Sequence, residues 1–188
     1  SEMCIRDSVY TTPASLRLCE RGPVTVTVTD QWGNPVANGT VVTLTADGVR
    51  LTFLESGSFE YYPTTQGGVA TATLVAGNLA SPPNGWTMAD AGAANSGVKW
   101  VAVTSPGVPH TIDIVAAPST IAAFSGTAII TATVYDCADT PNRLSGETVN
   151  FSANFGMLDP LAASSDVNGQ ASTAYSSTQA GTAVITAS

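Results

Sequence analysis

Few residues in this chain have the types and spacing that acid–base or nucleophilic chemistry requires. His110 is the single histidine, and it lies in the stretch Pro106-Gly-Val-Pro-His-Thr111. A catalytic histidine needs a nucleophile and an orienting acid nearby, and paired-carboxylate hydrolysis needs two acids that flank a cleft. The acidic residues lie instead in turn-forming stretches. We interpret His110 as a solvated linker residue, and we expect no catalytic site, no bound cofactor and no enzymatic activity.

Asp30, Asp136 and Asp166 each follow an alternating segment and precede turn-forming residues. An aspartate in that place accepts hydrogen bonds from the backbone amides of its own turn, and this is the role that we predict. Calcium binding is the alternative. Asp166-Val-Asn-Gly169 resembles the start of a calcium loop but lacks the fuller pattern and its distal glutamate. At a domain junction, Asp136 and Asp139 are the candidate ligands of a structural calcium ion.

The cysteines suggest a covalent link. Cys19 and Cys137 remain once Cys4, in an atypical leading segment, is set aside, and paired cysteines in a secreted protein favour a disulfide. In a seven-strand sandwich, the loop after the first strand and the loop after the second strand lie at opposite ends. Cys19 falls in the former loop of a first domain and Cys137 in the latter loop of a second, so stacked domains would bring them together. We predict an interdomain Cys19–Cys137 disulfide, with free thiols or other partners as the alternatives.

Tryptophans are the candidates for ligand contact. Trp32 lies between the second and third predicted strands, and Trp86 and Asp90 lie in an inserted segment near 76–96. Loops at that end of a sandwich carry binding residues in antibody variable domains, so these three residues form candidate binding loops. The alternative is that both tryptophans anchor a long loop or pack on a preceding repeat. Trp100 is expected in a strand, in the core or on the sheet surface.

The charge balance argues against a nucleic-acid partner. The 188 residues carry six Lys and Arg against 14 Asp and Glu, a formal net charge of −8, and lysine occurs only at Lys99. Nucleic-acid binding requires clustered basic side chains that neutralise phosphates. No run approaches the roughly 18 apolar residues of a membrane span. We therefore expect neither a nucleic-acid partner nor a membrane span in this sequence.

An internal repeat predicts the elements that position these residues. Three pairs of segments recur in the same order: 24–30 with 130–136, 64–74 with 165–175, and 98–104 with 182–187. They alternate with period two, which is typical of strands with one buried face, and turn-forming clusters separate them. No segment has a convincing 3.6-residue period. The pattern predicts an all-β chain of two tandem immunoglobulin-like β-sandwich domains.

The predicted domains cover residues 9–106 and 107–188, and the first carries insertions near 46–63 and 76–96. Residues 1–8 fit neither the pattern nor the composition that follows and resemble a translated sequencing-adapter remnant. We exclude them from the domain prediction.

Several motifs together resemble one known family. They are a T-A-T-V-x-D strand, a G-N-P-V turn, a T-V-x-F strand, a D-x-N-G-Q-A hairpin and a closing A-G-T-A-x-I-T-A-S strand. This series looks like the bacterial Ig-like domain group 1, the repeat of invasin- and intimin-type adhesins. The resemblance is strongest over 107–188, where Phe155-Gly-Met-Leu-Asp-Pro160 also matches, and looser over 9–106.

The resemblance implies adhesion as the context and an extracellular location, at the cell surface or attached to the outer membrane. The expected function is that of structural spacer or stalk repeats in a surface or secreted adhesin-like protein, with neighbouring repeats as partners. One alternative is a binding module that contacts a host or cell-surface protein or glycan through Trp32 and Trp86. Another is an accessory region of a large secreted enzyme.

Overall fold

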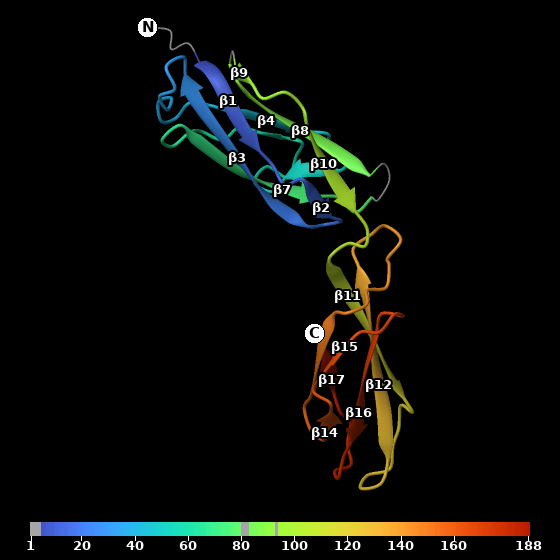
Figure 1. Cartoon of the computed structure of the whole chain (residues 1–188). Helices are drawn as coiled ribbons and strands as arrows, with labels where there is room; N and C mark the ends of the chain where they lie inside the picture. The colour runs from blue at the N-terminus through green and yellow to red at the C-terminus, as the bar shows by residue number, and fades with distance from the viewer. Residues whose placement is uncertain (1–4, 80–82, 93) are drawn as a thin grey trace. The chain divides into compact units, whose positions relative to one another are not determined.

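The computed structural model describes residues 5–79, 83–92 and 94–188. Across these residues every regular element is a β-strand (Figure 1). The described residues form no helix that is long and apolar enough to cross a membrane. The chain divides into two compact units, Ser1–Val108 and Pro109–Ser188. The predicted boundary between residues 106 and 107 lies next to this division.

Unit 1 is built from two sheets. The first contains, in spatial order, β1 (Ile5–Thr11), β3 (Arg21–Asp30), β7 (Val69–Ala76) and β5 (Leu51–Phe53). The second contains β2 (Ser15–Arg17), β10 (Lys99–Thr104), β8 (Asn84–Ala91), β4 (Thr43–Ala46) and β6 (Glu60–Tyr61), with β9 (Ala94–Asn95) beside β8. Neighbouring strands are antiparallel except β2 and β10, which are parallel. The predicted insertion near 46–63 thus supplies β5 and β6.

Alternation along β3 explains how unit 1 forms its core. Val24, Val26 and Val28 are buried, and the threonines between them face the other side of the sheet. Successive side chains of a strand point to opposite faces, so this sequence places one apolar face against the second sheet. Burial of each valine stabilises the unit by roughly 1.5–3 kcal/mol.

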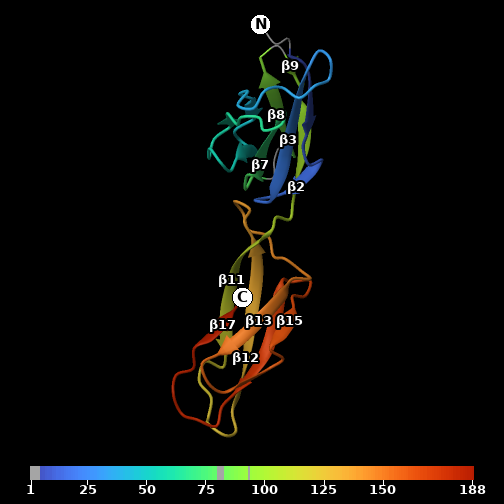
Figure 2. The same cartoon turned by 90° about the vertical axis from the view of Figure 1, so that its left-hand side faces the viewer.

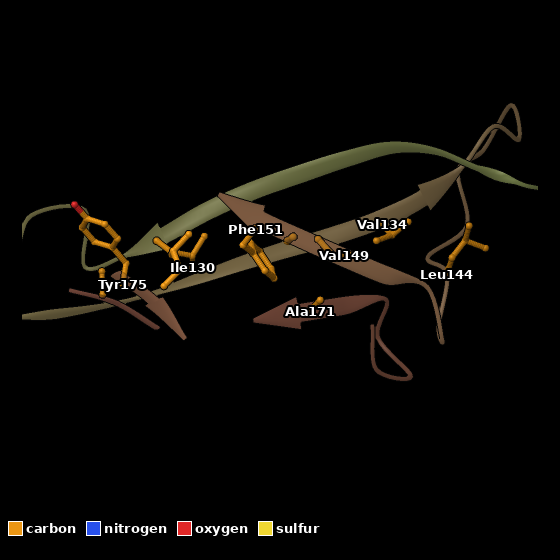
Figure 3. Packing of buried hydrophobic residues seen from close by; sticks show 10 residues of the cluster. Ile130, Val134, Leu144, Val149, Phe151, Ala171 and Tyr175 are labelled. Atoms are coloured by element: carbon orange, nitrogen blue, oxygen red, sulfur yellow. The ribbon is translucent and has the colours of Figure 1, made fainter. Parts of the chain in front are cut away.

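Unit 2 has the same plan with fewer strands. One sheet contains β11 (Pro109–Ala117), β12 (Thr127–Asp136), β16 (Gln170–Ser176) and β14 (Met157–Asp159), and the other contains β15 (Ala162–Ser164), β13 (Thr148–Ala153) and β17 (Ile185–Ala187). Figure 2 shows β13 crossing in front of β12. Between the layers lies a core that includes Ile130, Val134, Val149 and Phe151 (Figure 3).

Equivalent hydrogen bonds close the two units. The N–H of Val28 donates to the Gly68 carbonyl at 2.8 Å, and the N–H of Val134 donates to the Gly169 carbonyl at 2.9 Å. Three further backbone hydrogen bonds of unit 1 have an equivalent in unit 2. The bond from Asp30 N to Asn34 O corresponds to that from Asp136 N to Asn142 O, and the bond from Val36 N to Val28 O corresponds to that from Leu144 N to Val134 O. The bond from Gly39 N to Thr65 O corresponds to that from Gly146 N to Ser165 O. The first two repeated blocks therefore correspond in three dimensions.

Gly68 and Gly169 explain why the hairpin between the second pair of blocks needs glycine. Their φ angles are +80° and +71°, in the left-handed region where a Cβ is strained. A Cβ on Gly68 would lie 2.7 Å from the Cβ of Pro35, and one on Gly169 would lie 2.8 Å from the Cβ of Arg143. Either glycine is thus fixed by both backbone angle and space.

The prediction for the third pair of repeated segments is wrong. We paired 98–104 with 182–187, but β17 pairs with β13 as β8 pairs with β4, whereas β10 lies on the far side of β8. Residues 182–187 therefore correspond to β8. The error arises because the inward residues of β8 are small, namely Gly85, Thr87, Ala89 and Ala91, and they lack the alternation of large apolar residues that marks the other blocks.

The leading segment also differs from expectation. Strand β1 begins at Ile5, and Ser8 pairs with Val28. Half of the excluded residues 1–8 thus continue an edge strand of unit 1, and Cys4 lies outside the described residues.

Candidate functional site

Asp30 organises the turn that follows β3. Its Oδ1 accepts hydrogen bonds from the N–H groups of Trp32 and Asn34, both at 2.9 Å, and its Oδ2 accepts one from Asn34 Nδ2 at 3.2 Å. Desolvation opposes ionisation of this carboxyl, but the hydrogen bonds from Asn34, Trp32 and Gly33 outweigh it and lower the pKa of Asp30. The predicted turn-capping role is confirmed.

Asp136 holds the equivalent place in unit 2 and is only 1% exposed. Its Oδ1 accepts hydrogen bonds from the N–H groups of Asn142 at 2.7 Å and Ala138 at 3.2 Å, and its Oδ2 accepts one from Asn142 Nδ2 at 2.9 Å. A buried carboxylate requires such partners. The capping prediction is confirmed here as well.

The calcium ion that we considered at Asp136 and Asp139 stays a prediction, and the hydrogen bonds within the loop do not favour it. Calcium takes six to eight oxygen ligands, but both oxygens of Asp136 are engaged within their own loop, and Asp139 is exposed. Among the described residues, no group of three or more His, Cys, Asp and Glu side chains is placed to hold a metal.

Asp166 closes the hairpin before β16. Its Oδ1 accepts hydrogen bonds from the N–H groups of Gln170 at 2.9 Å and Asn168 at 2.8 Å. The bond from Gln170 is the largest influence on its pKa, which is lowered by that bond, by Asn168 and by the charge of Arg143, against desolvation. The segment that resembles a calcium loop thus forms a self-contained turn.

The candidate binding loops are only partly loops. Trp32 lies in the turn after β3 and is 74% exposed. Trp86 and Asp90, which we expected in an inserted loop, lie within β8, where Asp90 pairs with Thr43 and Trp86 with Trp100. Small inward residues disguise this strand in the sequence, and the loop assignment of Trp86 and Asp90 is wrong.

The two tryptophans lie on different elements. Trp32 lies in the turn after β3, whereas Trp86 lies within β8, where its carbonyl accepts a hydrogen bond from the N–H of Asp47, the residue directly after β4. Trp86 lies instead opposite Trp100, which is 65% exposed on the sheet surface, as one of the two expectations for Trp100 had it.

The remaining candidates lie at strand ends. Cys19 follows β2 with a φ of 59°, and Cys137 follows β12 directly. Both are half-buried, and the Cys19–Cys137 disulfide stays a prediction. His110 is exposed as expected, but it lies in β11, at a register irregularity between Pro109 and Thr111, and not in a linker.

The sequence interpretation missed a buried polar pair in unit 1. The Tyr10 hydroxyl lies 2.6 Å from Thr87 Oγ1, which in turn donates to the Thr45 carbonyl at 2.9 Å. Burial raises the pKa of Tyr10 to about 12, although the hydrogen bond to Thr87 acts in the opposite direction. Because Tyr10 lies on an edge strand and Thr87 in the unrecognised β8, no pattern in the sequence connects them.

Comparisons with known proteins give structural but not sequence relatives. No protein-family model and no curated protein matches the chain. The Escherichia coli adhesin FdeC has a TM-score of 0.50 at 17% identity, over 96% of this chain and 58% of that one. The Yersinia pseudotuberculosis adhesin InvE gives 0.43 at 17%, over 95% and 54%, and the D0-D1 domain of intimin gives 0.38 at 19%, over 97% and 90%.

This chain spans little more than half the length of the FdeC and InvE structures. At such identities a likeness informs on the fold alone, and the FdeC match agrees with the sheet topology described above. The chain consists of two tandem immunoglobulin-like β-sandwich domains, a fold that is similar to that of the FdeC structure.

Proposed function

We propose that the two domains are structural spacers, the stalk repeats of an adhesin-like bacterial protein that is secreted or held at the cell surface. The observation that carries this proposal is the repeated scheme of hydrogen bonds, since the same closure at Gly68 and Gly169 builds two similar units in one chain. Each unit has its own core and can contribute length without a ligand.

The connection between the units supports a spacer. The chain passes from Thr104, the end of β10, to Pro109, the start of β11, through four residues that include Pro106. Proline fixes φ and favours an extended path.

The polar groups described above also favour a passive role. The carboxylates of Asp30, Asp136 and Asp166 are engaged by amides of their own turns, and His110 lies exposed on an edge strand. These groups stabilise loops and are not arranged to transfer protons. The proposal therefore includes no catalysis, and its partners are neighbouring repeats of the same chain.

A binding module is the second candidate, and one observation favours it. Trp32 is 74% exposed on a turn whose backbone Asp30 fixes, and a rigid exposed aromatic side chain suits contact with a glycan or protein. An accessory region of a secreted enzyme is a third candidate, and no contact among the described residues specifically favours it.

Force spectroscopy on the chain held at both ends tests the spacer. In reductant, a spacer should give two separate unfolding events, and Pro109–Ser188 should release about 290 Å of contour at ~3.6 Å per residue. A glycan array probed with the native chain and with Trp32→Ala forms the second arm. Binding that the substitution abolishes, or a single unfolding event, would overturn the proposal.

A further inference from the structure

The sequence contains two acceptor motifs for N-linked sugar, Asn38-Gly39-Thr40 and Asn150-Phe151-Ser152. Such a motif is an asparagine followed, after any residue except proline, by serine or threonine, and its use requires an accessible surface segment. Because short motifs also occur by chance, the structure around each asparagine decides whether a transferase can reach it. The two motifs differ in this respect.

Asn38 lies in an exposed turn between β3 and β4. Asn38 and Gly39 are exposed, and Gly39 has a φ of +85° with open space beside it, as suits the third residue of a type II turn. A hydrogen bond from the N–H of Thr40 to the Ala37 carbonyl closes the turn, and it is long, at 3.3 Å. A weakly closed turn at the surface opens locally at low cost, so an enzyme can bind around it.

The Asn38 side chain leaves its reactive nitrogen available. Its Oδ1 accepts a hydrogen bond from the N–H of Gly67 at 2.7 Å, whereas its Nδ2 donates to no group among the described residues. Nδ2 is the atom to which an N-linked sugar is attached. An amide that carries a sugar keeps Oδ1 and one N–H, so the contact with Gly67 survives the modification.

Asn150 lies instead within a paired strand. On one side of β13, Asn150 pairs with Ala162 of β15, and on the other side Ser152 pairs with Thr186 of β17. Phe151, the middle residue of the motif, is 4% exposed in the core, and the hydroxyl oxygens of Ser152 and Thr186 lie 2.6 Å apart. A transferase can bind this motif only after β13 separates from its neighbours and Phe151 leaves the core.

Unit 2 contains the turn of Asn38 without the motif. Gly146 corresponds to Gly39, because its φ is +82° and its N–H also donates at 2.8 Å to a carbonyl of a neighbouring segment. Ser145 is exposed and Glu147 is half-buried, as are the two residues that flank Gly39. The motif can therefore be transplanted into a turn of the same geometry.

We propose that Asn38 is an acceptor site for an N-linked sugar in the folded chain and that Asn150 is not. The donor is a sugar activated by a diphosphate, which is linked to a nucleoside or to a lipid. The Asn38 Nδ2 attacks the anomeric carbon, a C–N bond replaces the C–O bond to the diphosphate, and the diphosphate leaves with the electron pair. The amide nitrogen passes one proton to a base of the transferase. This modification does not depend on the spacer function.

The test exposes the folded full chain to two transferases that recognise the motif, each chosen because it modifies synthetic peptides of residues 35–43 and 147–155 alike. One is a soluble enzyme supplied with UDP-glucose, and the other is a membrane enzyme supplied with a lipid-linked oligosaccharide. Peptide mapping by mass spectrometry gives the occupancy of each asparagine. With at least one donor, Asn38 should be modified at least about tenfold faster than Asn150, and the successful donor identifies the source of the sugar.

Three variants separate the motif from the turn. Thr40→Ala removes the motif and should abolish modification, whereas Thr40→Ser keeps the motif and should preserve it. In the double variant Ser145→Asn, Glu147→Thr, the equivalent turn of unit 2 should become modified. Tryptophan fluorescence checks that unit 1 remains folded in the first two variants. If Thr40→Ala does not fold, the transplanted motif decides.

The proposal is overturned if Asn38 stays unmodified with both donors. Equal rates at Asn38 and Asn150 also overturn it, because the motif alone would then decide and the fold would not. A third contrary result is a double variant of unit 2 whose turn remains unmodified, since the geometry of the turn would then not be what admits the enzyme.

Discussion

Removal of the Asp136 carboxylate should destabilise unit 2 strongly. In Asp136→Ala, the amides of Ala138 and Asn142 and the Asn142 side chain lose their acceptor. A hydrogen bond to a charged group contributes about 1.5–3 kcal/mol, and three bonds to one carboxylate are not additive. Because Ala138 and Asn142 are near the surface and regain water, we expect a loss of about 3 kcal/mol.

For a unit of this size, such a loss lowers the melting temperature by roughly 15 °C. The chain allows the two units to be followed separately, because all three tryptophans, Trp32, Trp86 and Trp100, lie in unit 1. Tryptophan fluorescence therefore reports unit 1 alone, whereas far-ultraviolet circular dichroism reports both. In reductant, Asp136→Ala should move a dichroism transition and leave the fluorescence transition in place.

Asp30→Ala is the matched control, since Asp30 caps the equivalent turn but is far more exposed. It should shift the fluorescence transition by less than Asp136→Ala shifts the dichroism transition. Asp136→Asn keeps Oδ1 for both amides and should fall between wild type and alanine. Equal losses for the two alanine variants, or a fluorescence shift caused by Asp136→Ala, would refute the idea that burial gives this carboxylate its larger role.

Further predictions concern other contacts. Tyr10→Phe removes the hydrogen bond to Thr87 and should lower the free energy of unfolding of unit 1 by about 1 kcal/mol, measured by tryptophan fluorescence. Because burial raises the pKa of Tyr10 in the folded state to about 12, the stability of the native protein should also fall between pH 10 and 12. This fall should vanish in the variant. The folded pKa of Asp166 is lowered, so its contribution is complete above the unfolded value near ~3.9 and is lost as pH falls through the folded value; Asp166→Asn should flatten stability against pH in acid, and an unchanged slope would contradict this. If Cys19 and Cys137 pair, the disulfide closes a loop of more than one hundred residues, and reduction should lower the free energy of unfolding of the native chain by about 5 kcal/mol. The stability of Cys137→Ser should not change with reductant. A non-reduced peptide map without a cross-link between residues 19 and 137 would refute the pairing.

Alternating strands were predictable, because their inward and outward faces differ in polarity. The valines of β3 and the isoleucine, alanine and valine of β12 mark the core face directly. Asp30 and Asp136 were predictable as turn caps, since an aspartate that ends such a strand meets the amides of the turn. Both features, the alternating strands and the turn caps, depend on residues that are close together in the sequence, and for this reason the sequence alone predicts them.

Strand β8 was not predictable by the same rule. Its inward side chains, from Gly85 to Ala91, are small, and its outward Trp86 and Met88 are the bulky ones. Space limits the inward side at Gly85, where a Cβ would lie 2.7 Å from Leu51. The large side chains of this strand therefore point outward and the small ones inward, the reverse of the usual pattern, and the sequence of the strand resembles that of a loop. Matching of 182–187 to β10 followed from this omission.

Burial of individual polar groups depends on packing that no local pattern records. Asp30 and Asp136 have similar sequence contexts, yet Asp136 is almost fully buried. Such features require knowledge of which elements lie next to one another.

The hydrogen bond from Leu144 to Val134 in unit 2 has a consequence for resistance to proteolysis. Unit 2 contains a single basic residue that a trypsin-like protease could recognise, Arg143. Arg143 forms a bridge with Tyr135, and the N–H of the following Leu144 donates to the Val134 carbonyl at 2.9 Å. The peptide bond between Arg143 and Leu144 is thus hydrogen-bonded to a core strand. A trypsin-like protease can cleave unit 2 at this bond only after the segment unfolds locally.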